Sequence, residues 1–558
     1  MSRIISSSFL YVLLLANVLM ARAQTTGWAL IPGGNSINNI HGSCFDKDGN
    51  CYLAGSFENA PIEIGGTTLL PVADKDAFIA SFDASGNARW AKAIGGAEID
   101  QAQAIRFDSL GNVFAAGNFN SSSIFIDGTT LSAHSGYDFF IVKYDSLGHL
   151  LWAANPDQSN GNESLFDIAI DHFGNLYAIG SFDGSSITLG AFTLQNPNNG
   201  KALLLFKMDP SGTVLWAKTS MGAGDEAGTA LTLGSQNDVF IAGTFNGVNM
   251  TLQGQSLENR DALGTSSDVF YAHYDRFGSL LMLAQAGGNG QDHVSDILFT
   301  NESKVVLTGT FDGPSIQFNN QSYLYNAGLQ DVFVTTCRAD GATESTQAIS
   351  GSGDERSGEL SLESDGGFLL CGGTNSLLLN PGNTAYLNQG GSDIFLARFH
   401  ASGQLDWTRM LGAEGHDEGF QAHRLANGSI ILCGNTDSQQ LSLPSNIVSP
   451  SGRMNAFICS FASTTSIASE MPTRPLQIVC MPNPTKNDLF YICPFHTLTA
   501  HPCFISLNNS AGECFYKTNT VCKEERNRIE LQDVPNGIYN LQIISGNKTA
   551  NRKICINH

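Results

Sequence analysis

Acidic residues recur in this sequence beside closely spaced glycines. Five stretches carry the pattern: Gly95-Gly96-Ala97-Glu98-Ile99-Asp100, Gly222-Ala223-Gly224-Asp225-Glu226, Gly288-Asn289-Gly290-Gln291-Asp292-His293, Gly351-Ser352-Gly353-Asp354-Glu355 and Gly412-Ala413-Glu414-Gly415-His416-Asp417-Glu418. Carboxylates that converge from equivalent positions could bind Ca²⁺ or a cationic ligand. In the alternative interpretation, each Asp accepts hydrogen bonds from backbone amides where a strand begins. The recurrence favours this capping role, and it nominates one set of residues for a metal or ligand site: Asp100, Asp225, Asp292, Asp354 and Asp417.

Motifs of known enzymes are absent from the sequence. It contains no G-x-S-x-G elbow, no H-E-x-x-H and no glycine loop that ends in lysine, and it has no calcium loop of the EF-hand type. His293 and His416, each next to an Asp, are the only pairs to inspect for acid–base work. We therefore predict no catalytic residue and no cofactor. The alternative is a glycan hydrolase or lyase that uses Asp100, Asp292 and Asp417, which requires two carboxyls at glycosidase separations.

The acidic stretches belong to a repeat. Its marker is a short apolar run that ends in glycine, found at Gly55, Gly117, Gly180, Gly243, Gly309, Gly372 and Gly434, with spacings of 62–66 residues. A second apolar run follows about twenty residues later, then a glycine turn and a strand that carries tryptophan. Each of the seven copies therefore predicts four antiparallel strands, A to D, with a long variable connection between B and C.

Four-stranded units repeated around an axis predict a seven-bladed β-propeller over residues 24–462. The seventh copy has no D strand after Phe461, whereas Trp28 precedes Trp90 by one period of 62 residues. We therefore expect the N-terminal strand to complete the last blade and to remove the free edges. All five tryptophans occupy the D-strand position, which favours packing between blades over a sugar-binding platform.

The repeat resembles a known family. The segment Asp108 to Gly117, followed by Asp138 to Trp152, is similar to the SBBP, or seven-bladed β-propeller, repeats of secreted bacterial proteins. The resemblance covers about residues 28–461. It implies a propeller fold and a tendency toward binding or surface roles, without a common catalytic motif.

The N-terminal residues have the pattern of an export signal. Arg3, the apolar run from Phe9 to Val18 and the small residues before Gln24 follow the order of a secretory signal peptide with cleavage near Ala23, so residues 1–23 are expected to be removed. Export permits disulfides. Cys44 and Cys51 flank a turn, and if Phe45 pairs with Asn50 the two thiols face each other across a hairpin.

The last part of the chain has a different character. A Ser/Thr/Pro-rich segment, 463–475, reads as a linker. Residues 476–558 contain short strand-like runs that predict a small β-sandwich. Their motifs resemble the C-terminal sorting domain, type A, of cargo for the type IX secretion system. The matching residues are Pro482, Asn483, Pro484, Gly537, Ile538, Tyr539 and Lys553.

Together these patterns predict an all-β protein that is exported from the cell. The sorting resemblance implies the outer-membrane secretion machinery as a partner, and a final location outside the cell or at its surface. A net charge of −22 argues against nucleic acid as a partner. The leading hypothesis is a non-enzymatic binding or adhesion scaffold that holds a protein or glycan through its B–C connections.

Overall fold

The structure is a computed structural model that forms two compact units, Met1–Ser463 and Thr464–His558. In the first unit it describes residues 28–34, 36–198, 200–319, 322–381, 386–442, 447–448 and 454–462. In the second it describes 479–481, 488–492, 502–509, 514–521, 527–531, 534–545 and 548–556. The expected signal peptide, the linker and Pro482, Asn483 and Pro484 lie outside these ranges. The regular secondary structure of the described ranges is β-strand, and no helix that could span a membrane is found there.

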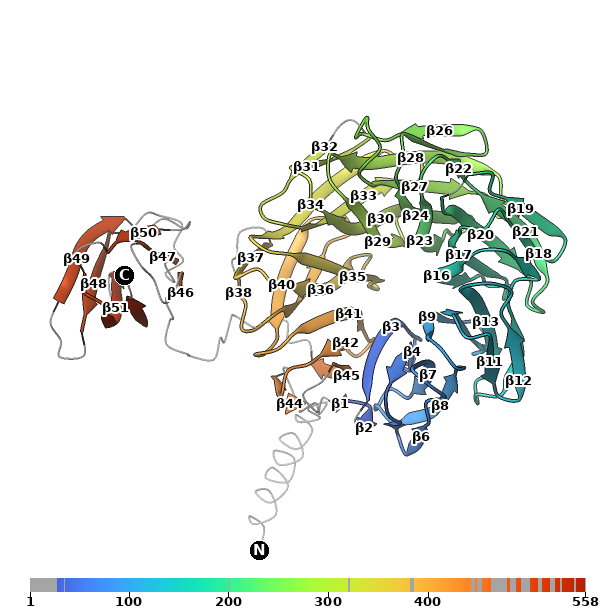
Figure 1. Cartoon of the computed structure of the whole chain (residues 1–558), viewed down its shortest axis with the longest axis horizontal. Coiled ribbons are helices and arrows are strands. Elements are labelled where there is room, and N and C mark those ends of the chain that lie inside the picture. The colour runs from blue at the N-terminus through green and yellow to red at the C-terminus, as the bar shows by residue number, and fades with distance from the viewer. Residues whose placement is uncertain are drawn as a thin grey trace, which may run out of the picture. The chain divides into compact units, whose positions relative to one another are not determined.

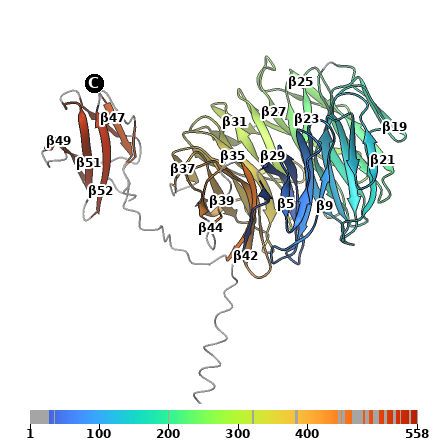
Figure 2. The ribbon, with the colours of Figure 1, turned by 60° about the horizontal axis from the view of Figure 1, so that its bottom comes forward.

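The first unit consists of antiparallel sheets that follow one another around a central space (Figures 1 and 2). Seven four-stranded units can be traced in the described residues, each in the order A, B, C, D. The first three are β3 (Ile37–Phe45), β4 (Cys51–Glu58), β7 (Lys75–Phe82) and β8 (Ala88–Ile94); β9 (Asp100–Phe107), β10 (Val113–Phe119), β13 (Asp138–Tyr144) and β14 (Leu150–Ala154); β16 (Glu163–Ile170), β17 (Leu176–Phe182), β20 (Ala202–Met208) and β21 (Val214–Thr219). The next three are β23 (Glu226–Leu233), β24 (Val239–Phe245), β27 (Asp268–Tyr274) and β28 (Leu280–Gly288); β29 (Asp292–Phe299), β30 (Lys304–Phe311), β33 (Asp331–Arg338) and β34 (Thr343–Gly351); β35 (Glu355–Leu362), β36 (Phe368–Thr374), β39 (Asp393–Phe399) and β40 (Leu405–Leu411).

The last unit is built from both ends of the repeat region. Its A, B and C strands are β41 (Asp417–Arg424), β42 (Ser429–Thr436) and β45 (Asn455–Ala462), and its fourth strand is β1 (Ala29–Leu30). Ala29 pairs with Cys459 and Leu30 with Ile458. The N-terminal strand thus takes the place that the position of Trp28 predicts. This pairing supplies the partner that the edge of β45 would otherwise lack.

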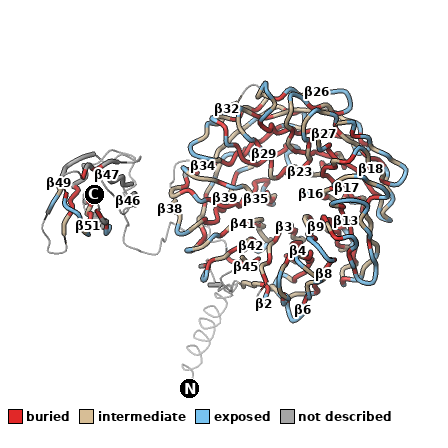
Figure 3. Tube along the Cα trace, viewed as in Figure 1, coloured by how far each residue is buried: buried red, intermediate tan, exposed pale blue. Residues whose placement is uncertain are grey.

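The B and C strands are buried almost throughout because both of their faces pack against neighbouring sheets (Figure 3). The tryptophans lie at these sheet-to-sheet contacts. The indole N–H of Trp90 donates to the carbonyl of Ser146 at 3.3 Å, and that of Trp152 to Pro210 at 3.2 Å. Both acceptors lie in the C–D turn of the following unit, so the recurrent tryptophan joins successive sheets, as its placement in the sequence indicates.

The B–C connections differ from the expected loops, because each contains a short hairpin. The hairpins are β5 (Ile62–Ile64) with β6 (Thr67–Leu69), β11 (Ser123–Ile126) with β12 (Thr129–Ser132), β18 (Ser186–Leu189) with β19 (Phe192–Gln195), β25 (Asn249–Leu252) with β26 (Gln255–Glu258), β31 (Ser315–Phe318) with β32 (Ser322–Tyr325), β37 (Leu378–Pro381) with β38 (Tyr386–Leu387) and β43 (Leu441–Ser442) with β44 (Ile447–Val448). Most of the first strands pair with the end of the preceding unit: β5 with β2 (Gly33–Gly34), β18 with β15 (Gln158–Ser159), β25 with β22 (Met221–Gly222), β31 with β28 and β37 with β34. Hairpin residues such as Ile62 on β5 and Ile124 on β11 are fully buried. Much of each connection is therefore structural, because it satisfies the backbone groups of the preceding D–A segment.

The expected disulfide between Cys44 and Cys51 is wrong. Asp46 and Asn50 close the turn with a backbone hydrogen bond of 3.0 Å, so Phe45 pairs with Cys51 and Cys44 pairs with Tyr52. This register is one residue away from the predicted one, and a shift of one residue sends a side chain to the opposite face of a sheet. Cys44 and Cys51 pack into different hydrophobic clusters, and both thiols are free.

The second unit contains two sheets in its described residues. One has the order β46 (Val479–Met481), β47 (Asp488–Ile492) and β50 (Asn527–Glu530); the other has the order β49 (Cys514–Val521), β48 (Pro502–Asn508), β51 (Gly537–Ser545) and β52 (Lys548–Ile556). Gly537, Ile538 and Tyr539 begin β51, and Lys553 is exposed on β52. Tyr539 is buried, and its hydroxyl donates to the carbonyl of Pro535 at 2.8 Å. The tyrosine of the sorting motif therefore fixes the turn that leads into β51.

Candidate functional site

The acidic residues of the repeat occupy one structural position, at the start of each A strand. The seven equivalent residues, identified by their pairing with strand B, are Asn38, Asp100, Glu163, Glu226, Asp292, Glu355 and Asp417. All seven are buried. Sequence analysis identified three of them. Asp225 is exposed and Asp354 half-buried, each one residue before the buried Glu226 or Glu355, and Glu163 was missed.

Hydrogen bonds to Asp100 and Asp417 support the capping interpretation. The Gly96 amide donates to Asp100 Oδ2 at 2.7 Å, and the Ser121 hydroxyl donates to the same oxygen at 2.8 Å. Asp417 Oδ2 accepts from the Ala413 amide at 2.8 Å and from the Ser438 hydroxyl at 2.9 Å. These carboxylates therefore connect the segment between strands D and A to the serine that follows strand B. Because they are buried and bound to the protein itself, the hydrolase alternative is not favoured.

A residue of the C strand of the preceding unit faces each of these positions, and in five cases it is a second acid. The C-strand residues, in chain order, are Asp76, Asp138, Ala202, Asp268, Asp331, Asp393 and Asn455. Five junctions between sheets therefore hold two carboxyl groups: Asp76 with Asp100, Asp138 with Glu163, Asp268 with Asp292, Asp331 with Glu355 and Asp393 with Asp417. At the junction that joins the first unit to the last, the pair is Asn38 with Asn455, whose side chains lie 3.4 Å apart. We call these contacts the junction pairs.

The junction pair of Asp268 and Asp292 lacks hydrogen-bond donors for three of its four carboxyl oxygens. Neither buried carboxyl oxygen of Asp292 accepts a hydrogen bond of ordinary geometry, and Asp268 Oδ1 is also unpartnered. Burial, followed by the charge of Asp268, raises the pKa of Asp292 to about 9, and burial raises the pKa of Asp268 to about 6. Two carboxyls in one apolar site cannot both ionise cheaply, so the pair retains a proton near neutral pH.

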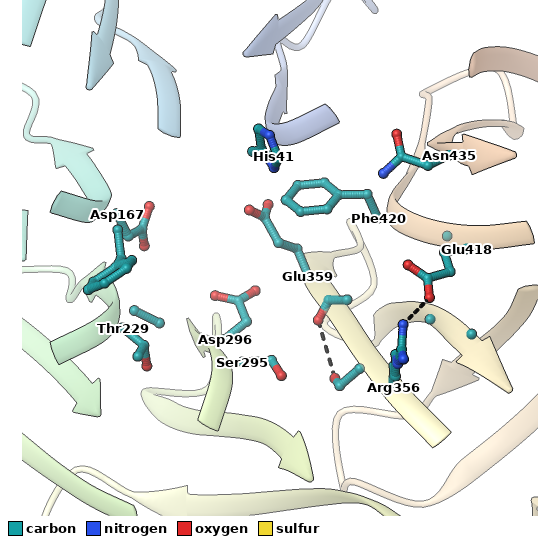
Figure 4. A pocket seen from close by; sticks show the side chains of 17 residues that line it. His41, Asp167, Thr229, Ser295, Asp296, Arg356, Glu359, Glu418, Phe420 and Asn435 are labelled. Carbon is teal, nitrogen blue, oxygen red and sulfur yellow. Dashed lines mark hydrogen bonds and ion pairs between the residues drawn. The ribbon is translucent and has the colours of Figure 1, made fainter. Parts of the chain in front are cut away.

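A different set of side chains lines a cavity of about 290 Å³ at the centre of the first unit (Figure 4). The A strands bulge where they pass the glycine of strand B, and the bulged residues face the centre. They include His41, Phe166, Thr229, Ser295, Glu359 and Phe420, all of which line the cavity. This cavity was not predicted from the sequence, because neither the bulge nor its register is visible in the apolar pattern.

Three carboxyl groups from three sheets reach this cavity: Asp167, Asp296 and Glu359 (Figure 4). Asp167 Oδ1 accepts from Arg106 Nη2 at 2.9 Å, and Asp296 Oδ2 accepts from the Leu360 amide at 2.7 Å. Burial, followed by the charge of Asp167, raises the pKa of Asp296 to about 7. Burial also raises the pKa of Glu359 well above its usual range. The cavity is thus an acidic, partly desolvated site.

Other charged groups of the cavity are neutralised. Arg356 and Glu418 form an ion pair at 2.5 Å. Burial, followed by the charge of Lys75, lowers the pKa of His41 to about 4, so its ring is neutral at physiological pH. In the described part of the chain, no group of three or more His, Cys, Asp or Glu side chains has the arrangement to hold a metal ion.

Comparisons with known proteins identify the tail. The family described as "Secretion system C-terminal sorting domain" matches residues 480–557. The match confirms the resemblance seen at Gly537–Tyr539 and Lys553. The chain therefore carries the sorting domain of the type IX secretion system, which implies export and a location outside the cell or at its outer surface.

The repeat region has more distant relatives. An uncharacterized WD repeat-containing protein of Acanthamoeba polyphaga mimivirus is 24% identical over 278 residues, which are 43% of this chain and 20% of the relative. The regulatory protein FlaEY of Caulobacter vibrioides is 26% identical over 335 residues, which are 55% of this chain and 33% of the relative. The chain thus spans a third or less of these relatives. A mutant apocarotenoid oxygenase of Synechocystis superimposes with a TM-score of 0.32 at 10% identity, covering 70% of this chain and 95% of the oxygenase.

Proposed function

We propose that this chain is a seven-bladed β-propeller of the SBBP type that the type IX system exports, and that it acts outside the cell as a non-enzymatic binding scaffold. The sorting-domain match carries the proposal. Seven equivalent four-stranded units and the pairing of β1 with β45 support the closed ring, as does the similarity to a WD repeat-containing protein. Its first partner is the outer-membrane secretion machinery.

Export can be tested by removing the tail. A chain that ends at residue 475 keeps the whole repeat region and loses the sorting domain. We expect the full chain to be accessible to protease added to intact cells or to be found in the medium, and the truncated chain to be retained in the periplasm. Equal export of the two chains would refute the assignment. A periplasmic reporter protein controls for leakage.

Binding to a protein or glycan is assigned to the exposed side chains of the B–C connections. Phe125 is 58% exposed on β11, in the B–C connection of the second unit, and Leu263 is 79% exposed in that of the fourth unit. Because the hairpins themselves are structural, single substitutions at exposed positions test this surface better than loop replacement. We expect Phe125→Ser to weaken attachment of the protein to its host surface or matrix, whereas Leu147→Ser, in a C–D turn, leaves attachment unchanged. Equal attachment of both variants and the parent would contradict the proposal.

A further inference from the structure

The central cavity has more negative than positive charge in its inner layer. Asp167, Asp296 and Glu359 converge there from three sheets, and Arg106 is the one cation that the described residues place in contact with them. The Arg356–Glu418 pair is neutral as a unit. When all three carboxyl groups are ionised, one guanidinium leaves an excess of two negative charges in a partly desolvated space.

Glu359 differs from the other two acids in having no internal partner. Both oxygens of Asp167 and of Asp296 accept backbone amide hydrogen bonds, for example Leu231 N to Asp167 Oδ2 at 3.0 Å. For Glu359, the described residues provide no hydrogen bond and no ion pair. The strand that carries it has a wider bulge than the others, since the pairing passes directly from Ser357 to Leu360. This extra bulged residue places a free carboxylate in the cavity.

Aromatic rings also line the cavity, beside small and polar residues. Phe166 is 38% exposed although it lies at the centre of the ring of sheets, and Phe420 lies beside Glu359 (Figure 4). His41 is held by the Ser56 hydroxyl at 2.9 Å and does not supply a charge. Ring faces attract organic cations, and they do so more strongly where water is partly excluded. Aromatic walls around an unpaired carboxylate are unsuited to anions, and they favour an organic cation over a hydrated metal ion.

We propose that the central cavity binds one small organic cation through an ammonium or guanidinium group, with Glu359 as its counter-ion and Phe166 and Phe420 as its walls. A volume of about 290 Å³ limits the ligand to a free amine or to a single Lys- or Arg-like side chain of a partner. This inference deepens the proposed binding function and depends on it.

Ligand binding should be linked to the release of protons. Burial raises the pKa of Glu359, and burial with Asp167 raises that of Asp296 to about 7, so these groups hold protons that a bound cation displaces. Affinity for the cation therefore increases as the pH rises from about 6 to about 8. A neutral ligand of the same shape would not show this dependence.

Isothermal titration calorimetry on the full chain tests the proposal, with 1,4-diaminobutane as the ammonium probe and agmatine as the guanidinium probe. We expect one site and the release of protons into the buffer. Glu359→Gln should weaken binding tenfold or more, whereas the control Glu302→Gln removes the same charge from the turn before β30 and leaves affinity unchanged. Glu359→Gln also removes an unpaired, half-buried carboxylate, so its urea midpoint should be no lower than that of the parent.

Other outcomes are equally informative. Absence of binding by both probes, equal binding by Glu359→Gln, or tighter binding of Ca²⁺ at the same site would overturn the proposal. A short peptide containing Arg distinguishes the two sources of the cation: binding as tight as that of agmatine identifies a partner side chain, and binding of agmatine alone identifies a free amine. Surface exposure of Glu359→Gln, measured with the protease assay, separates failure of this site from failure of the export assignment.

Discussion

The junction pairs predict that the first unit becomes less stable as the pH rises through neutrality. The pair of Asp268 and Asp292 is the clearest case, because three of its carboxyl oxygens have no hydrogen-bond partner. Arg260 and Asp312 are the other charged groups that influence Asp292, and they do not cancel the effect of burial. The perturbation is Asp292→Asn, which removes one acid and reproduces the type of side chain found at Asn38.

The sign follows from the direction of the pKa shift. In the unfolded chain Asp292 has the ordinary pKa of 3.8, whereas in the folded protein its pKa rises to about 9. The contribution of Asp292 to the free energy of unfolding is complete below its pKa in the unfolded chain, and it is lost progressively as the pH rises to its pKa in the folded protein. Between about pH 5 and pH 7 the folded state holds one more proton than the unfolded state, so the free energy of unfolding falls by about 1.4 kcal/mol per pH unit, or about 2.7 kcal/mol in all.

Urea unfolding at pH 5, 6 and 7 measures this slope. All five tryptophans lie in the first unit, so their fluorescence reports on this unit without interference from the tail. In Asp292→Asn, the change of the free energy of unfolding with pH should be smaller by about one proton. The stability of the variant relative to the parent should therefore be greater at pH 7 than at pH 5. The control is Asp225→Asn, which removes an exposed acid from a similar connection. An unchanged slope in Asp292→Asn, with an unchanged dependence on urea, would refute the reasoning.

Other substitutions test the same architecture. Asn38→Asp should introduce a new pH slope at the closing junction, of about 1 kcal/mol or more between pH 5 and 7 in urea unfolding, and a slope identical to that of the parent would contradict this. Trp90→Ala should lower the free energy of unfolding by about 3–5 kcal/mol, whereas Trp90→Phe keeps most of the packing and loses about 1 kcal/mol with the indole hydrogen bond; equal effects of the two would argue against the packing role. The buried thiols of the first unit should resist maleimide until the protein unfolds, since burial raises the pKa of Cys44 to about 12; rapid native labelling in peptide mapping, or a Cys44–Cys51 disulfide, would show that the register is wrong.

The parts of the fold that the sequence predicts are those fixed by long-range periodicity. Glycine spacing locates the B strands, and the distance between Trp28 and Trp90 locates the closing strand β1. Both signals tolerate an error of a residue or two. The tail can be predicted from the sequence equally well, because its motif residues at Gly537–Tyr539 follow a turn and begin a strand.

Register is what the sequence does not reveal. Asp225 and Glu226 are neighbours, and the sequence pattern selected Asp225, which is exposed, instead of Glu226, which is buried. Counting back a constant distance from each B-strand glycine would have selected it and would also have found Glu163. The same one-residue ambiguity produced the incorrect Cys44–Cys51 pair. The central cavity depends on bulges, which add residues to one strand without changing the repeat length.

The junction between the first and the last unit differs from its neighbours in a way that follows from its place in the sequence. Asn38 and Asn455 are 417 residues apart in sequence, whereas the acids of the other pairs are separated only by the C–D hairpin and the short segment that leads to the next A strand. Bringing chain ends together costs more conformational entropy than joining consecutive units. A carboxyl pair would add the requirement that a proton be taken up at the same step, because an ionised pair repels. An amide pair has donors and acceptors at every pH, so the contact between the first and the last unit is independent of protonation, whereas the junctions that hold two carboxyl groups are not.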